Sequence, residues 1–131
     1  MSIYFSIAIG GALGALSRYW LSEFVNEFGS LGNPGSAQFP AGIFLVNVLG
    51  SFLIDVVFVL IVEKSILGQQ WQPLLTIGFL GAMTTFSTFS LDTLLLMQQG
   101  HYTTAFAYVA LSVVICLLAA YGGIMLVRAV F

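Results

Sequence analysis

Four long apolar stretches constrain the fold of this chain more than any other feature of its sequence. They cover about residues 3–21, 39–63, 72–97 and 103–128. A helix needs about 20 mainly apolar residues to cross the hydrocarbon core of a bilayer, and each stretch is long enough. Only 6% of the residues are charged, against about a quarter in soluble domains. The sequence therefore predicts an all-α membrane protein with one domain, residues 1–131, and four transmembrane helices.

The second and third linkers between these stretches are short, and the first, residues 22–38, contains the turn-forming run S-L-G-N-P-G-S. Aromatic residues stand at the ends of the predicted spans, where lipid headgroups are expected: Tyr19, Trp20, Trp71 and Tyr102. No Lys or Arg precedes the first apolar stretch. We therefore expect that stretch to remain in the mature protein rather than to act as a cleaved signal peptide.

The distribution of Lys and Arg gives the helices almost no preferred orientation. The side with the N-terminus, the second linker and the C-terminus carries Lys64 and Arg128, and the other side carries Arg18. Loops rich in Lys and Arg normally stay cytoplasmic, so two interpretations remain open. A weak preference fixes one orientation, or the chain inserts both ways and forms an antiparallel dimer with its two-fold axis in the membrane plane.

Small residues recur at helical spacing in the first stretch. Gly10 and Gly14 are four residues apart, as are Gly11 and Ala15. Such pairs let helix backbones approach closely in lipid, where hydrophobicity cannot drive association. They predict a compact and oligomeric bundle, without indicating its activity.

Most of the hydroxyl groups in the third stretch are concentrated in the run T-T-F-S-T-F-S at 84–90. Hydroxyl side chains compete with helical hydrogen bonds, and the preceding Gly78 and Gly81 weaken a helix further. The run therefore predicts a break near the middle of the third helix. Non-helical backbone inside a membrane must be buried in protein or line a hydrated cavity, and its freed carbonyl groups can bind a cation. A polar seam between two helices would explain the same run.

Other polar and aromatic groups also lie within the predicted spans. Asn47 either makes an interhelical hydrogen bond or offers N–H donors to an anion. Phe86 and Phe89 share a helix face, and their positive ring edges either line an anion path or pack in a core. A hydroxyl stripe follows the fourth stretch at four-residue spacing, which packing would also explain: Thr104, Tyr108 and Ser112.

The remaining chemistry-bearing residues exclude several classes of function. Asp55 is an ionisable group well inside the second stretch, which makes it a functional candidate. Cys116 is the only cysteine, so no intrachain disulfide forms, and we interpret it as a small core residue. One His, one Cys and scattered carboxylates form no catalytic triad and no metal-ligand spacing. No basic patch indicates nucleic acid. The pattern favours passage of a small species over an enzyme.

Three motifs resemble the Fluc/CrcB family of fluoride channels over essentially the whole chain. The most specific is G-F-L-G-A-M-T-T-F-S-T-F-S at 78–90, and G-G-A-L-G-A-L-S-R at 10–18 and L-V-N-V-L-G-S-F at 45–52 support it. The resemblance implies a fluoride-selective channel that exports fluoride passively from the cytoplasm across a bacterial inner membrane. It also implies an antiparallel, dual-topology homodimer with two pores.

The resemblance also implies roles for individual residues. The predicted fluoride path comprises Asn47, Phe86, Phe89, Ser87, Thr88, Tyr108 and Ser112, with Arg18 at the vestibule. The backbone carbonyls of Gly81 and Thr84, two from each subunit, would hold a structural Na⁺ at the dimer centre that is not transported.

Three positions depart from the family pattern. Asp55 stands where Gly is usual, Ile43 where Thr is usual, and Asp92 where Glu is usual. Because a carboxylate beside an anion path would repel fluoride, we expect Asp55 to face the dimer interface or the lipid boundary. Two alternative functions remain: a small dual-topology proton-coupled exporter that uses Asp55, and a non-transporting assembly factor that uses the small-residue surfaces.

Overall fold

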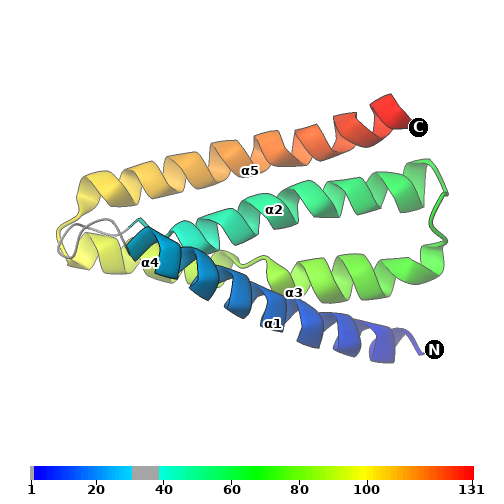
Figure 1. The fold of residues 1–131 in the computed structure, drawn as a ribbon, viewed down its shortest axis with the longest axis horizontal. Coiled ribbons are helices and arrows are strands. Elements are labelled where there is room, and N and C mark those ends of the chain that lie inside the picture. The colour runs from blue at the N-terminus through cyan, green and yellow to red at the C-terminus, as the bar shows by residue number, and fades with distance from the viewer. Residues whose placement is uncertain (1, 31–38) are drawn as a thin grey trace.

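A computed structural model describes residues 2–30 and 39–131 of the chain. Over these ranges the protein is helical and contains no strand, which confirms the predicted all-α class (Figure 1). Most of the predicted turn run S-L-G-N-P-G-S lies outside the described residues. The elements are α1 (Ile3–Ser30), α2 (Ala41–Phe58), the π-helix η1 (Val59–Glu63), the 3₁₀ helix η2 (Gln69–Trp71), the π-helix η3 (Pro73–Leu80), α3 (Gly81–Met83), α4 (Phe86–Gln98) and α5 (Tyr102–Val130).

Three segments of the described chain are long and apolar enough to cross a membrane: Ala41–Glu63, Gln69–Gln98 and Tyr102–Val130. They coincide with the last three stretches predicted from the sequence. The first predicted span lies within α1, which is 28 residues long but is not among the three. Three residues of α1, Gly10, Gly11 and Arg18, reduce its mean hydropathy. A fourth span therefore stays a prediction.

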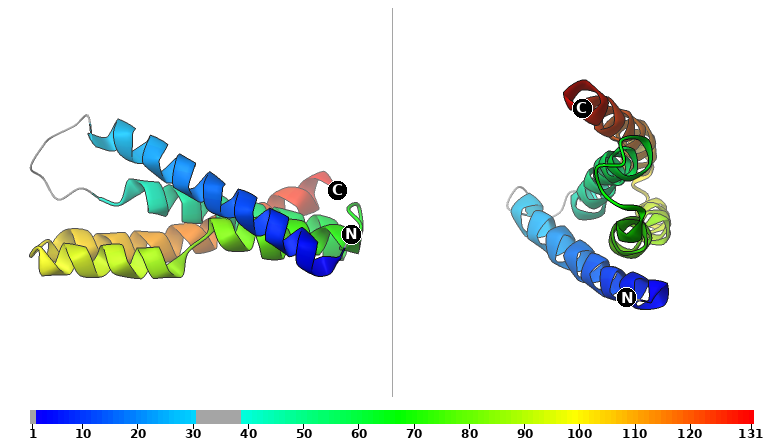
Figure 2. Two further views of the ribbon diagram at one scale, coloured as in Figure 1. Left: turned by 90° about the horizontal axis from the view of Figure 1, so that it is seen from below. Right: turned by 90° about the vertical axis from the view of Figure 1, so that its right-hand side faces the viewer.

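The long helices run roughly along the length of the molecule, and α2 is central to their arrangement. Seen end-on, α1 and α5 lie on opposite sides, with α2 and η3 between them (Figure 2). The chain ends of α1 and α5 lie at the same end of the molecule (Figure 1). There, the Arg128 guanidinium donates two hydrogen bonds to the Glu63 carboxylate, at 2.6 and 2.9 Å. The second linker and the C-terminus are thus on one side, as the sequence predicts.

Glycines set the separation between α1 and η3. A Cβ atom on Gly10 or Gly14 would overlap the backbone of Leu74 or Phe79, so only glycine allows this approach. The close packing predicted for the Gly10–Gly14 pair is therefore confirmed. A Cβ on Gly11 would meet no atom within 4 Å in the described chain, so the second small-residue pair has no close packing partner there.

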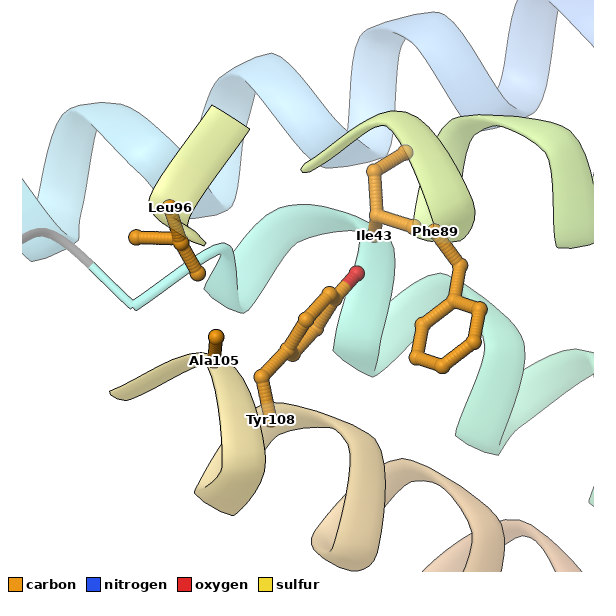
Figure 3. Close-up of a cluster of buried hydrophobic side chains, with 5 residues drawn as sticks. All are labelled: Ile43, Phe89, Leu96, Ala105 and Tyr108. Carbon is orange, nitrogen blue, oxygen red and sulfur yellow. The ribbon is translucent and has the colours of Figure 1, made fainter. Parts of the chain in front are cut away.

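Two hydrophobic clusters lie at different levels of the bundle. The first joins α2, α4 and α5 through Ile43, Phe89, Leu96, Ala105 and Tyr108, and Figure 3 shows the Tyr108 ring extending from α5 toward Ile43. The second joins α2 to η3 and α3 through Val46, Leu80 and Met83. The residues that connect α3 to α4 follow Met83 of the second cluster and precede Phe89 of the first. The candidate site is built around these connecting residues.

Candidate functional site

The helical backbone is interrupted between α3 and α4. Thr84 has φ −77° and ψ 149°, and Thr85 has φ −150° and ψ 120°, so both are extended. The Thr85 hydroxyl accepts a hydrogen bond from the Thr88 N–H at 3.1 Å. Thr is a favourable N-cap residue because its oxygen satisfies a backbone donor that lacks a helical partner. The polar run thus starts a new helix at Phe86.

Asn47 of α2 binds both backbone groups of Thr85. Its Nδ2 donates to the Thr85 carbonyl at 3.1 Å, and its Oδ1 accepts from the Thr85 N–H at 2.9 Å. The side chain therefore replaces the helical hydrogen bonds that extended backbone cannot make. An amide nitrogen carries two N–H groups, so one donor remains for another acceptor. Asn47 therefore makes an interhelical hydrogen bond, which was one of its two predicted roles. Its second N–H group is the donor that the other predicted role, binding an anion, requires.

The hydroxyl groups of the polar run fall into two sets. The Thr84 and Ser90 hydroxyls donate to the carbonyls four residues earlier, Leu80 O at 3.0 Å and Phe86 O at 2.9 Å. The other three form a cluster in which Thr85 Oγ1 lies 3.1 Å from both Ser87 Oγ and Thr88 Oγ1. Two hydroxyls are therefore used in helical back-bonding, and three surround the beginning of α4.

Carbonyl oxygens lose their usual helical donors at the interruption, and those of Gly81 and Thr84 are among them. In an unbroken helix, the carbonyl of Gly81 would accept from Thr85 N–H and that of Thr84 from Thr88 N–H. Here the Thr85 N–H donates to Asn47 Oδ1, and the Thr88 N–H donates to Thr85 Oγ1. For both carbonyls that the family resemblance implies as cation ligands, the helical donor therefore has another partner.

The two phenylalanines of the run differ in their surroundings. Their ring centroids are 5.4 Å apart with an interplanar angle of 47°. Phe89 is 8% exposed and lies 5.1 Å from the Tyr108 ring, whereas Phe86 is 79% exposed. Phe89 is therefore part of the core as well as the site, and Phe86 presents most of its surface outside this single subunit.

A cavity of about 390 Å³ lies where α2, α4 and α5 meet the interruption. Its lining residues are Asn47, Ser51, Thr84, Thr85, Phe86, Phe89, Ser112, Val113, Cys116 and Leu117. None of them is charged at neutral pH. The wall instead offers an amide, several hydroxyls, a thiol and two aromatic rings. Such a wall can replace part of the hydration of a small ion without a fixed counter-charge.

The structure brings some predicted site residues to this wall and leaves others apart. Four members of the predicted fluoride path line the cavity: Asn47, Phe86, Phe89 and Ser112. Tyr108 is fully buried beside them in the first cluster, and Ser87 and Thr88 stand at the start of α4. Arg18 lies on α1 and Gly81 on α3, and neither is in the cavity wall.

Five lining residues were not among the predicted site residues: Ser51, Thr85, Val113, Cys116 and Leu117. Ser51 and Cys116 each stand four residues after a predicted one, Asn47 on α2 and Ser112 on α5, so helical periodicity could have identified them. The interpretation of Cys116 as a core residue was wrong: it is partly exposed and lines the cavity.

Two buried hydroxyls beside or in the cavity have no hydrogen-bond partner in the described part of the chain, those of Tyr108 and Ser112. Ser112 is 6% exposed and Tyr108 0%. The Tyr108 hydroxyl lies beside the Asp92 carboxylate and interacts with it. Leaving a buried polar group unpaired costs about 1–3 kcal/mol. The Ser112 hydroxyl, which lines the cavity, therefore suits a ligand or water there.

The positions that depart from the family pattern lie outside the wall. Ile43 is buried in the first cluster, so an apolar side chain is well accommodated there. Asp55 is half-buried on α2 and does not line the cavity. Among residues 2–30 and 39–131, no group of three or more His, Cys, Asp or Glu side chains could hold a metal ion.

Comparison with known proteins places this site in a family context. Residues 5–124 match a family model described as CrcB-like protein, Camphor Resistance (CrcB). The chain is 45% identical over 124 residues to the "Fluoride-specific ion channel FluC" of Saccharophagus degradans, which covers 95% of this chain and 88% of the relative. It is 46% identical over 122 residues to the protein of the same name from Hahella chejuensis, covering 93% and 91%. The protein of that name from Shewanella loihica is also 46% identical over 122 residues, with 92% of each chain covered.

Proposed function

The chain belongs to the CrcB family, and from that membership we propose that it is a fluoride-selective ion channel, not an enzyme, that lets fluoride leave the cytoplasm passively. The observation that carries the proposal is the uncharged cavity wall, in which the predicted path residues Asn47, Phe89 and Ser112 come together. Whole-length relatives named as fluoride-specific channels support the choice of ion. A negative-inside potential favours exit of an anion by about 2.3 kcal/mol per charge per 100 mV, so export needs no other energy source.

Fluoride is small and strongly hydrated, so a channel must replace the water that the ion loses. The Asn47 amide has one N–H to spare, and the Ser112 hydroxyl has no partner in the described chain. The edges of Phe86 and Phe89 carry partial positive charge. Conduction requires binding that is weak enough for release, and neutral donors meet that requirement better than a fixed cation. Ser87, Thr88 and Tyr108 extend the path, and Arg18 gathers anions at a vestibule.

The active form is an antiparallel, dual-topology homodimer in the bacterial inner membrane, with α1 as a fourth transmembrane helix and the third helix broken at Thr84–Thr85. Three membrane-capable helices and the helical interruption support this architecture. So does the near-equal distribution of Lys and Arg on the two sides. Phe86, a cavity residue that is 79% exposed in one subunit, supports completion of the path by a second copy.

A structural Na⁺ at the dimer centre fits the carbonyl groups at the interruption. Gly81 and Thr84 would each contribute a backbone carbonyl whose helical donor bonds elsewhere, and the second subunit would contribute the same pair. Carbonyl oxygens freed by an interrupted helix are suitable cation ligands. When bound, the ion would connect the subunits and supply a positive field near the anion path. It is not transported.

A proton-coupled exporter is the second candidate, because Asp55 lies within a membrane-capable segment and makes no ion pair or hydrogen bond with the described residues. In that case the Asp55 carboxylate would exchange protons for substrate. The cavity favours the channel, since Asp55 is absent from its wall. A non-transporting assembly factor would move no ion at all.

Fluoride efflux from vesicles that contain the purified protein separates these functions. We expect voltage-driven efflux that persists when a protonophore collapses the proton gradient, and that persists in Asp55→Gly. Loss of transport under either condition would support the exporter. No fluoride release by correctly folded wild-type protein would refute the channel and leave the assembly factor.

A further inference from the structure

We propose that Cys116 is a binding site for a soft monovalent metal ion such as Ag⁺, and that a metal bound there obstructs the anion path. The blocking effect rests on the proposed channel function, whereas the metal site itself does not. The proposal begins with position. Cys116 is the only cysteine of the chain, is partly exposed, and lines the cavity four residues after Ser112 on α5.

A second observation in the same wall points to a ligand. The Ser112 hydroxyl is buried, with the residue 6% exposed, and has no hydrogen-bond partner in the described chain. Because residues four apart lie on one helix face, Ser112 and Cys116 present a hydroxyl and a thiol to the cavity one turn apart. Together they offer one strong soft ligand and one weak neutral oxygen.

The charge balance of binding suits an uncharged cavity. The Ag⁺ ion replaces the thiol proton: the S–H bond breaks, an S–Ag bond forms, and the proton leaves to solvent. The product carries no more charge than the thiol did, so the cost of burying an isolated ion is avoided. A divalent metal on the same single thiol would leave a net positive charge. The wall therefore favours a monovalent metal.

The chemistry of the donors also separates this metal from the ions already considered. Thiolate is a soft ligand that selects soft metals, whereas hard cations prefer carboxylate, carbonyl and water. Na⁺ would therefore not compete for Cys116. Fluoride is a hard anion and would not remove Ag⁺ from sulfur. Asn47 and Ser112, two members of the proposed path, line the same cavity of about 390 Å³, so a metal on Cys116 occupies space that a passing anion needs.

Binding can be measured without transport. Full-length purified protein is treated with methyl methanethiosulfonate in chloride-free nitrate buffer, and the intact mass reports the reaction. The thiolate sulfur attacks the reagent, a disulfide bond forms, methanesulfinate leaves, and the thiol proton goes to solvent. Because the chain has one cysteine, the mass change reports Cys116 alone. We expect equimolar Ag⁺ to slow labelling at least tenfold, and Ser112→Ala to raise the Ag⁺ concentration needed for the same protection.

Blocking is then measured as fluoride efflux from vesicles in the same buffer. We expect micromolar Ag⁺ to reduce the wild-type rate at least tenfold and excess dithiothreitol to restore it. Cys116→Ser should keep its own untreated rate when Ag⁺ is added. A matched control moves the thiol to Val114, which is 52% exposed and lies about 200° around the helix from Cys116. The double variant Cys116→Ser, Val114→Cys should bind Ag⁺, and its rate of fluoride efflux should not fall.

The outcomes separate the two proposals. The inference would be overturned if Ag⁺ failed to protect the thiol from labelling, or if Ag⁺ slowed fluoride efflux through Cys116→Ser as much as through the wild type. It would also be overturned if Ag⁺ protected the wild-type thiol without slowing fluoride efflux. If untreated wild-type protein releases no fluoride, the channel proposal fails, and the labelling experiment alone decides whether Cys116 binds the metal.

Discussion

Replacing Asn47 by alanine removes both hydrogen bonds that connect α2 to the backbone of Thr85. The bonds are 3.1 and 2.9 Å long, and Thr85 is 7% exposed. Since Thr85 is extended, its N–H and C=O have lost the ordinary helical arrangement. The variant would therefore leave a buried donor and a buried acceptor without the side chain that satisfies them.

The magnitude follows from those two groups. A hydrogen bond contributes about 0.5–1.5 kcal/mol net, and an unsatisfied buried partner costs about 1–3 kcal/mol. Interhelical bonds in membranes average about 0.6 kcal/mol, because the unfolded chain also finds partners in the bilayer. Two bonds to a shielded backbone segment should exceed that average. We expect Asn47→Ala to lower the free energy of unfolding by about 2–4 kcal/mol.

Reversible unfolding in mixed micelles, followed by circular dichroism, measures this change. Asn26→Ala is a matched control, because the exposed Asn26 accepts a single hydrogen bond, from Gly42 N–H at 3.0 Å, and should therefore lose less than Asn47→Ala. If Asn47→Ala had the same free energy of unfolding as Asn26→Ala, the role assigned to the Asn47–Thr85 pair would be refuted.

Three further predictions concern packing, the aromatic pair and the cation. Gly14→Ala places a Cβ against the backbone of η3 and should lower the free energy of unfolding by about 1–3 kcal/mol. Gly11→Ala meets nothing within 4 Å and should leave that free energy nearly unchanged. Equal free energies of unfolding for the two variants would contradict the account of this interface. Phe86→Ile and Phe89→Ile should both reduce fluoride efflux sharply, but only Phe89→Ile should also lower stability, because Phe89 is 8% exposed and Phe86 79%; unchanged efflux in both would remove the ring-edge path. Replacing Na⁺ by a larger cation should gradually abolish efflux from vesicles, and indefinite full activity would argue against a bound Na⁺.

The sequence was sufficient to predict the helical class and three of the spans, because hydropathy over about 20 residues is a strong signal. It was less informative for the first helix, where Gly10, Gly11 and Arg18 dilute the apolar pattern. The small-residue rule predicted close packing at two pairs, and only Gly10–Gly14 has it. Which side of a helix meets a neighbour depends on tertiary packing, and spacing alone does not determine it.

The candidate site was predictable in its residue types more than in its bonding. The dense hydroxyls at 84–90 predict a helix break, and Thr84 and Thr85 within this run are extended. The pairing of Asn47 with Thr85 joins residues that are 38 positions apart, and no local pattern predicts it. Cys116 was interpreted from its apolar neighbours along the chain, although its spacing from Ser112 determines which face it shares.

The central claim is selective passage of fluoride, and anion efflux from vesicles carrying the purified protein tests it most directly, with fluoride and chloride measured side by side. The account predicts rapid fluoride loss with chloride retained, because small, neutral donors in the wall that holds Asn47, Phe89 and Ser112 must replace the hydration of the ion that passes. Equal release of both anions, or no fluoride release from a folded protein, would contradict it.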